Sequence, residues 1–384
     1  MIRQENANAS CDEIAATRRP LDRARHLPGR IYAAEEIYEQ EKREIFLKDW
    51  LCVGRVEEAP DPGSYFTFDV LGEPILISRG ADSVLRGFFN TCAHRGVTVA
   101  TESGAAKAFS CPYHGWTYGL DGRLLHAPHM EGVPGFDPAQ CGLRPVRLDT
   151  WQGWVFVNLG DEPADLTDFL GTAAERLAFV HAEDCRLANK WTFELPCNWK
   201  LGVENFQDVY HLRVLHADTF GSAVDVDNYV PELLERGNFF TFHQGAPLTP
   251  TGETLFAGLP CWAGQPPSSS CIAHISPNIM LFCRYDSVFI WICWPLGPNR
   301  TQITFYTTFH KTHFDDPDFA RKAKVYADFE QIIASEDQAM ISALQRAMTS
   351  NAYRAGRMSP YEHTIHHMMN HYLDRMGLID DGRI

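Results

Sequence analysis

Long hydrophobic runs are missing from this chain of 384 residues. Its richest apolar stretch, Val288–Leu296, has the length of a strand, whereas a helix that crosses a bilayer needs about 20 apolar residues. The first ten residues also lack the charged and then apolar pattern of an export signal. The sequence therefore predicts a cytoplasmic protein that does not enter a membrane.

Positive charge is scarce as well. The chain has 34 Lys and Arg against 49 Asp and Glu, which gives a formal net charge of −15. Such a chain is poorly suited to bind nucleic acid, because affinity for the phosphate backbone comes mainly from Lys and Arg. The rest of the composition, 45% hydrophobic and 22% charged, is that of an ordinary globular protein with about two domains.

Cysteine is present, but not in a pattern that predicts a disulfide framework. Eleven cysteines occur without an export signal, and most of them lie in apolar surroundings. We expect these to be small buried side chains, for example Cys261, Cys271 and Cys283. Two others, Cys92 and Cys111, have histidine neighbours and indicate a different role.

The chain changes character along its length and predicts an α+β fold. Short alternating runs broken by Gly, Pro and Asp over 51–159 indicate a small all-β domain. Further strand-like segments and a C-terminal helical region that begins at Asp316 follow. We expect an N-terminal arm and helix at 1–44 that pack on the last domain, the all-β domain at 45–160, and the last domain at 161–384.

Two Cys-His pairs lie within the predicted β domain. Cys92 and His94 are two residues apart, and Cys111 and His114 are three apart, in separate loops that contain glycine. Zinc sites of two Cys and two His usually pair like ligands on one element, whereas here each loop offers one of each. The pattern favours a [2Fe–2S] cluster with two Cys on one iron and two His on the other.

A second set of metal-ligand side chains follows in the stretch that starts at Asn198, a plausible helix N-cap. Asp208 and His211 are three residues apart and would share one face of a helix. His216 is five residues beyond His211, which turns it away from that face in a regular helix. Both histidines can therefore bind one metal only if the helix ends or bulges after His211.

A site of two histidines and one carboxylate needs one more acidic residue. Asp337 lies on an apolar stripe that includes Ile333 and Met340 in the C-terminal helical region. A buried carboxylate must be paired, protonated or bound to metal. Glu336 competes with Asp337, since it is spaced equally well from the same neighbours.

Taken in this order, the motifs resemble those of the large (α) subunit of Rieske non-haem iron oxygenases, the ring-hydroxylating oxygenase family. CAHRG and CPYHGWTY are similar to the family's two cluster loops, which implies cluster-ligand roles for Cys92, His94, Cys111 and His114. ENFQDVYHLRVLH is similar to its mononuclear iron motif, with His211 and His216 as ligands, and EDQAMISALQ points to Asp337 as the third. The resemblance also implies a Rieske domain followed by a catalytic domain with a central antiparallel sheet flanked by helices.

The resemblance implies a mono- or dioxygenase with a [2Fe–2S] cluster, a mononuclear Fe(II) and O2 as co-substrate. Asp208 would bridge the cluster of one subunit and the iron of its neighbour in a trimer. Electrons would come from NAD(P)H through a separate reductase or ferredoxin, because no Gly-x-Gly-x-x-Gly loop follows a strand. The chain is shorter than α subunits that pair with a β subunit, which favours a homotrimer.

The substrate is predicted less sharply. Aromatic residues between Phe239 and Trp294 indicate a pocket that suits an aromatic small molecule, and we expect hydroxylation of an aromatic substrate. Such a pocket would equally hold a methylated ammonium group, so oxidative N- or O-demethylation is the alternative. A zinc-stabilised structural protein or an electron carrier is the alternative of another class.

Overall fold

The computed structural model describes residues 12–221, 224, 226–243 and 247–378. The chain divides into two compact units, one made of residues up to Phe46 together with those from Thr167 onward, and the other of Leu47–Leu166. The expected N-terminal arm is described from residue 12, and its first eleven residues lie outside the described part. No helix among the described residues is both long and apolar enough to cross a bilayer.

The smaller unit is all-β and holds two antiparallel sheets. The larger one has the strand order β1-β10-β9-β4-β3-β2-β5. Its strands are β1 (Leu51–Arg55), β2 (Ser64–Val70), β3 (Glu73–Arg79), β4 (Leu85–Phe89), β5 (Gly104–Ala105), β9 (Pro145–Trp151) and β10 (Trp154–Asn158). The second sheet contains β6 (Phe109–Ser110), β7 (Thr117–Tyr118) and β8 (Leu124–His126). One Cys-His pair follows β4, and the other lies in the turn from β6 to β7.

The larger unit is built on one antiparallel sheet with the order β11-β17-β16-β15-β14-β13-β12. Its strands are β11 (Cys185–Leu195), β12 (Glu232–Leu234), β13 (Gly237–Phe242), β14 (Ser270–Ile275), β15 (Ile279–Cys283), β16 (Ser287–Gly297) and β17 (Arg300–His310). Aromatic side chains pack across neighbouring strands, for example Trp191 of the edge strand β11 on Phe305 of β17, with ring centroids 3.9 Å apart. Such stacking buries large apolar surface and stabilises the pairing of neighbouring strands.

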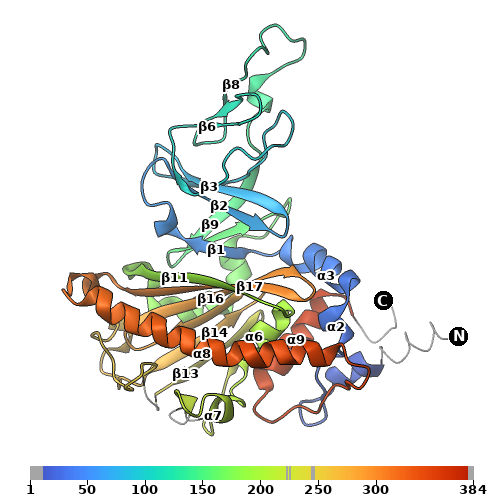
Figure 1. The fold of residues 1–384 in the computed structure, drawn as a ribbon, viewed down its shortest axis with the longest axis vertical. Coiled ribbons are helices and arrows are strands. Elements are labelled where there is room, and N and C mark those ends of the chain that lie inside the picture. The colour runs from blue at the N-terminus through green and yellow to red at the C-terminus, as the bar shows by residue number, and fades with distance from the viewer. Residues whose placement is uncertain (1–11, 222–223, 225, 244–246, 379–384) are drawn as a thin grey trace, which may run out of the picture. The chain divides into compact units, whose positions relative to one another are not determined.

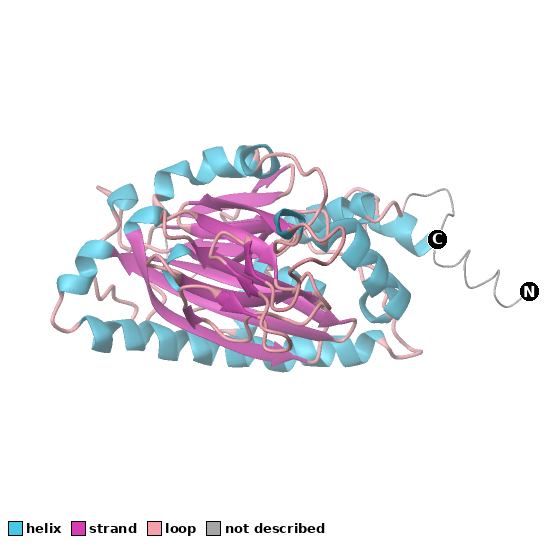
Figure 2. Ribbon diagram, turned by 90° about the horizontal axis from the view of Figure 1, so that it is seen from above, coloured by secondary structure: helices cyan, strands magenta, loops and turns pink. Residues whose placement is uncertain are grey.

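Helices flank this sheet (Figures 1 and 2). They are α2 (Arg30–Ala33), α3 (Glu35–Glu41), α4 (Leu166–Leu170), α5 (Thr172–Leu177), α6 (Trp199–Gln207), α7 (Leu212–Leu215), α8 (Phe319–Met348) and α9 (His363–Arg375), with a π-helical turn at Lys42–Phe46. The longest, α8, runs across the strands of the sheet (Figure 1). The predicted α+β architecture, an all-β domain followed by an antiparallel sheet flanked by helices, is confirmed.

Candidate functional site

The two Cys-His loops of the smaller unit have matching backbone hydrogen bonds. The N–H of Gly96 donates to the carbonyl of Cys92 at 2.8 Å, and the N–H of Gly115 donates to that of Cys111 at 3.0 Å. Both glycines have positive φ, +79° and +72°, a conformation that other residues rarely adopt. The sequence therefore folds both pairs into equivalent tight turns.

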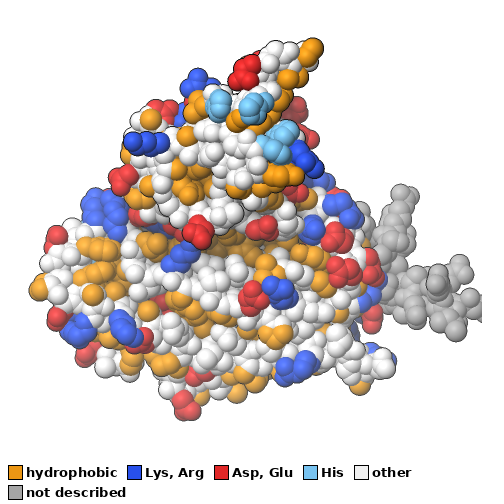
Figure 3. Space-filling model, turned by 45° about the horizontal axis from the view of Figure 1, so that its top comes forward, with side chains coloured by type: hydrophobic (Ala, Val, Ile, Leu, Met, Phe, Trp, Pro, Cys, Tyr) orange, Lys and Arg blue, Asp and Glu red, His pale blue; other side chains and the backbone are white. Residues whose placement is uncertain are grey.

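The four side chains of these loops offer two kinds of donor. Cys92 and Cys111 are buried, whereas His94 and His114 are exposed, with their ring centroids 4.6 Å apart. The Tyr118 hydroxyl lies 3.1 Å from Cys92 Sγ. Two enclosed thiols beside two outer imidazoles suit a cluster that takes sulfur ligands on one iron and nitrogen ligands on the other. Histidine side chains are visible on the surface of this unit in Figure 3.

In the larger unit, the helix that precedes the second motif begins as predicted but ends earlier than expected. The side chain of Asn198 accepts the N–H of Lys200 at 3.1 Å and caps α6. The helix ends at Gln207, because the Asp208 carboxylate accepts the N–H of Tyr210 at 2.7 Å and competes with helical bonding. The expectation that Asp208 and His211 share a helix face is therefore wrong, and a turn brings them together.

This early end of α6 lets both histidines face the same point. Nε2 of His211 and Nε2 of His216 lie 3.2 Å apart. Oδ1 of Asp337, from α8, lies 3.6 Å from the first and 3.1 Å from the second. One ligand-type atom from each of the three residues lies within 4.8 Å of the others. Two imidazoles and one carboxylate are a donor set suited to a divalent iron with open positions.

Asp337 is buried, but the apolar stripe expected around it is displaced. Met340 and Leu344 are 47% and 49% exposed, so they lie on the outer face of α8. The buried face instead includes Ala334, Asp337 and Ile341. The offset arises because the 3.6-residue repeat of a long helix allows two neighbouring apolar rows, and only one of them contacts the sheet.

Two further carboxylates hold the outer nitrogens of the histidines. Asp208 Oδ2 lies 3.1 Å from Nδ1 of His211, and Glu336 Oε2 lies 2.6 Å from Nδ1 of His216. The Thr219 hydroxyl also donates to that Glu336 oxygen at 3.0 Å. Glu336, the competing candidate for the third ligand, thus occupies an orienting position that the sequence did not reveal. Such partners fix the tautomer and the direction of a ligand histidine.

The electrostatics of the cluster favour a cation between the ligand atoms. Burial lowers the pKa of His211, but hydrogen bonds and charge from Asp208 and Asp337 outweigh it and raise the pKa to about 9. Burial raises the pKa of Asp337, but the two histidines outweigh it and lower the pKa. The carboxylates therefore attract positive charge, which protons supply in the absence of a metal.

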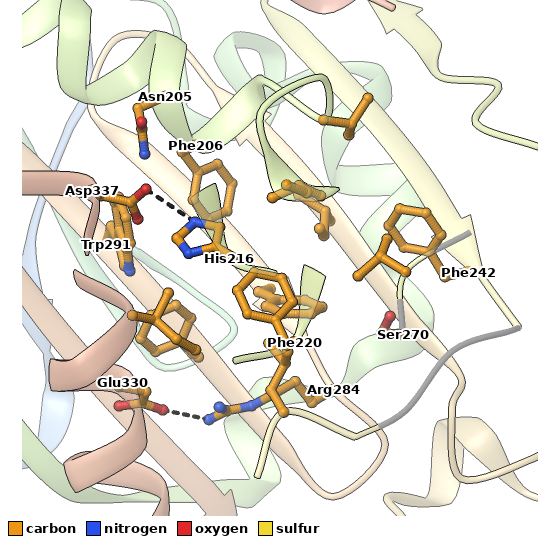
Figure 4. A pocket seen from close by; sticks show the side chains of 18 of the residues that line it. Asn205, Phe206, His216, Phe220, Phe242, Ser270, Arg284, Trp291, Glu330 and Asp337 are labelled. Atoms are coloured by element: carbon orange, nitrogen blue, oxygen red, sulfur yellow. Dashed lines mark hydrogen bonds and ion pairs between the residues drawn. The ribbon is translucent and has the colours of Figure 1, made fainter. Parts of the chain in front are cut away.

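A cavity of about 140 Å³ opens beside these residues. Its lining includes the aromatic side chains Phe206, Phe220, Phe240, Phe242, Phe282, Phe289, Trp291, Phe305 and Phe329. Figure 4 shows Phe206, Phe220 and Trp291 close to His216 and Asp337. Four of the phenylalanines, Phe206, Phe220, Phe305 and Phe329, lie outside the Phe239–Trp294 segment from which the sequence predicted the pocket.

The chain is similar to several characterised oxygenase subunits. It is 30% identical over 393 residues to the glycine betaine monooxygenase oxygenase subunit of Chromohalobacter salexigens, with 91% of this chain and 85% of that protein covered. It is 39% identical over 206 residues to the carnitine monooxygenase oxygenase subunit of Escherichia coli K12, a match that spans 53% of this chain and 55% of that protein. The chain thus matches only about half the length of that relative.

Solved structures of oxygenases are similar to this chain over nearly its whole length. The quaternary ammonium Rieske monooxygenase CntA in complex with its substrate L-carnitine matches with a TM-score of 0.78 and 27% identity, over 96% of this chain and 97% of that one. Naphthalene 1,2-dioxygenase with bound indole shares the fold, with a TM-score of 0.73 at 20% identity.

Two family models match the chain in sequence. The model of the Rieske [2Fe–2S] domain matches residues 49–137, and that of the ring hydroxylating alpha subunit catalytic domain matches residues 182–378. These domains imply a Rieske cluster and a mononuclear iron. The two Cys-His loops suit the cluster, and the set of two histidines and one carboxylate suits the iron. The chain belongs to the family of ring-hydroxylating alpha subunits and carries a Rieske domain ahead of the catalytic domain.

Proposed function

We propose that this chain is the terminal oxygenase of a monooxygenase that removes a methyl group from a quaternary ammonium compound. The observation that carries the proposal is a set of three ligand-type residues, His211, His216 and Asp337, that opens onto an aromatic pocket. Relatives named for carnitine and glycine betaine favour demethylation, the alternative in the sequence analysis, over hydroxylation of an aromatic substrate.

The aromatic rings next to the candidate iron site suit a methylated ammonium group. Phe220 stacks on His216 with ring centroids 4.8 Å apart, and Phe206 and Trp291 pack together at 5.3 Å. A quaternary ammonium group has no N–H to donate, so it cannot use hydrogen bonds. Faces of aromatic rings attract it through their quadrupole while excluding water.

The geometry supports two ligand sets. Cys92, His94, Cys111 and His114 would hold the cluster, and His211, His216 and Asp337 would hold Fe(II). The cluster would supply electrons one at a time, and the Fe(II) would supply open positions at which O2 is activated. The protein residues keep both Nε2 atoms directed at the site, through Asp208 and Glu336, and hold the methyl group beside it.

The proposed reaction removes the methyl group as formaldehyde. One oxygen atom of O2 is inserted into a C–H bond of the N-methyl group, and the other leaves as water after two electrons and two protons are taken up. The hydroxymethyl ammonium product then loses formaldehyde and a proton to leave a tertiary amine. A separate reductase or ferredoxin would deliver the electrons from NAD(P)H, and a homotrimer would place the cluster of one subunit near Asp208 of the next.

A substrate panel tests this function. Purified protein with reduced cluster and iron is exposed to O2 with carnitine, glycine betaine or choline, or with naphthalene or indole. We expect formaldehyde in proportion to O2 consumed with at least one ammonium compound, and no hydroxylated product from the arenes. Hydroxylated arene without formaldehyde from any ammonium compound would overturn the proposal and restore the aromatic alternative.

Glu336→Gln is expected to weaken Fe(II) binding about 10- to 100-fold, because the amide removes the charge that holds Nδ1–H of His216. Fe(II) titration of metal-depleted protein measures the affinity. The matched control is Glu183→Gln, which alters the exposed contact of Glu183 with His181 and should leave the affinity unchanged. Equal affinities for both variants and the wild type would show that Glu336 does not support the site.

A further inference from the structure

A buried arginine lies at one end of the pocket. Arg284 follows β15 in the tight turn to β16, and it is the only Lys or Arg among the described residues that line the cavity. Its side chain is 6% exposed. Figure 4 shows Arg284 and Glu330 at one end of the pocket, with Asn205 and Asp337 at the other. The guanidinium of Arg284 therefore lies away from the candidate iron site.

Two hydrogen bonds fix the guanidinium of Arg284, and they involve Nε and Nη2. Nε donates to Ser287 Oγ at 2.9 Å, and Nη2 donates to Glu330 Oε1 at 2.7 Å. Among the described residues, none accepts a hydrogen bond from Nη1. The guanidinium also lies over the ring of Phe289, 5.2 Å from its centroid. These contacts fix the direction of the fork and leave one donor group available to a ligand.

The carboxyl groups beside Arg284 are engaged elsewhere as well. The second oxygen of Glu330 accepts the hydroxyl of Thr307 at 2.8 Å, and Asp286 accepts the hydroxyl of Tyr326. Burial raises the pKa of both carboxyl groups, and the charge of Arg284 opposes that shift. Ser270 adds a hydroxyl to the pocket lining nearby.

We propose that the Arg284 end of the pocket binds the carboxylate of a zwitterionic substrate, a trimethylammonium compound that also carries a carboxylate group. This inference rests on the proposed function and narrows its substrate class. The methylated ammonium group lies among the aromatic rings near His216, and the carboxylate accepts hydrogen bonds from Arg284. An arginine fork matches carboxylate geometry, and a charged acceptor strengthens each bond. A trimethylammonium alcohol such as choline lacks that acceptor.

Calorimetric titration of the wild-type holoprotein without O2 is the first test, with carnitine, glycine betaine and choline as ligands. We expect the better-bound of the two carboxylates to bind at least about tenfold more tightly than choline. Choline binding as tightly as the better-bound carboxylate would overturn the inference while leaving the proposed function intact. Formaldehyde formed from none of the three in the substrate panel would instead overturn the proposed function.

The second test removes the charge. The double variant Arg284→Gln, Glu330→Gln replaces the ion pair by two amides, so no buried carboxylate is left unpaired. We expect the preference for carboxylates to fall to about one, with choline affinity within about twofold of the wild type. The matched control is Arg300→Gln, Glu194→Gln, which removes an exposed Arg–Glu pair of the same unit and should keep the preference.

Arg284→Lys keeps the positive charge but removes the forked guanidinium group. This variant is used for the test if the double variant does not fold. It is expected to weaken carboxylate binding about three- to tenfold and to leave choline binding unchanged. A preference as large as that of the wild type, in the variant that folds, would overturn the proposal. An equal loss of affinity for choline and the carboxylates would also overturn it, since that result assigns Arg284 a purely structural role.

Discussion

Asp337→Asn is expected to abolish product formation, with a fall of at least about a hundredfold, because it removes the only anionic member of the candidate iron site. An amide oxygen is a neutral and weaker ligand, and two imidazoles alone hold Fe(II) poorly. Iron content should fall from about three to about two atoms per chain, while about two sulfides remain in the cluster. Iron and sulfide analysis of the purified variant measures both.

The neighbouring residue provides the comparison for this variant. Glu336→Gln changes an acid one position away on the same helix, and its oxygen contacts the outer nitrogen of His216 instead of the inner one. It should therefore retain the mononuclear iron at high Fe(II) concentration. An Asp337→Asn protein with full iron content and normal turnover would exclude Asp337 as a ligand.

Asp208→Asn is expected to leave the cluster reducible and to lower product formation about a hundredfold. The Asp208 carboxylate only accepts hydrogen bonds, so it keeps the proton of His211 on Nδ1 and leaves Nε2 free. An amide can turn its NH2 group toward Nδ1 and move the proton to Nε2, which then cannot bind metal. The proposed electron path through Asp208 would be lost in the same variant.

Single-turnover oxidation of the reduced cluster by O2, in the presence of substrate, separates these effects. The variant should retain its cluster spectrum but oxidise it slowly and release little product. Asp227→Asn is the control, since that exposed carboxylate pairs with Arg213 on the surface and does not contact His211. Normal turnover in the Asp208 variant would contradict both roles.

The cluster loops could be predicted from spacing, because each turn is local. A Cys and a His within three residues, followed by a glycine at positive φ, define the loop without help from distant segments. The candidate iron site is different. Its residues come from a turn and from a helix more than a hundred residues later, and only the early end of α6 aligns the two histidines. Because that end depends on a side-chain bond of Asp208, helical spacing alone gave the wrong local structure.

Asp337 and Glu336 show why neighbouring acids are hard to assign from sequence. Both lie at acceptable positions of a helical repeat, and a rotation of one residue exchanges the inner and the outer role. The contacts with the histidines distinguish them, since Asp337 faces Nε2 and Glu336 faces Nδ1 of His216.

The pocket was only partly predictable for a related reason. The aromatic residues between Phe239 and Trp294 predicted an aromatic pocket. Three other lining residues, Phe206, Phe220 and Phe329, come from separate parts of the chain. The pairing of Arg284 with Glu330 joins a hairpin turn to α8 and has no local signature. The preference for a zwitterionic substrate that we propose depends on this pairing, so the sequence alone could not predict it.

The central claim is that one chain holds two iron centres. Electron paramagnetic resonance of the dithionite-reduced protein tests it most directly, and iron and sulfide content are measured on the same sample. We expect a rhombic signal with a low average g value, about three irons and about two sulfides per chain. A silent spectrum from a protein that contains zinc and no sulfide would contradict the account and support the zinc-stabilised alternative.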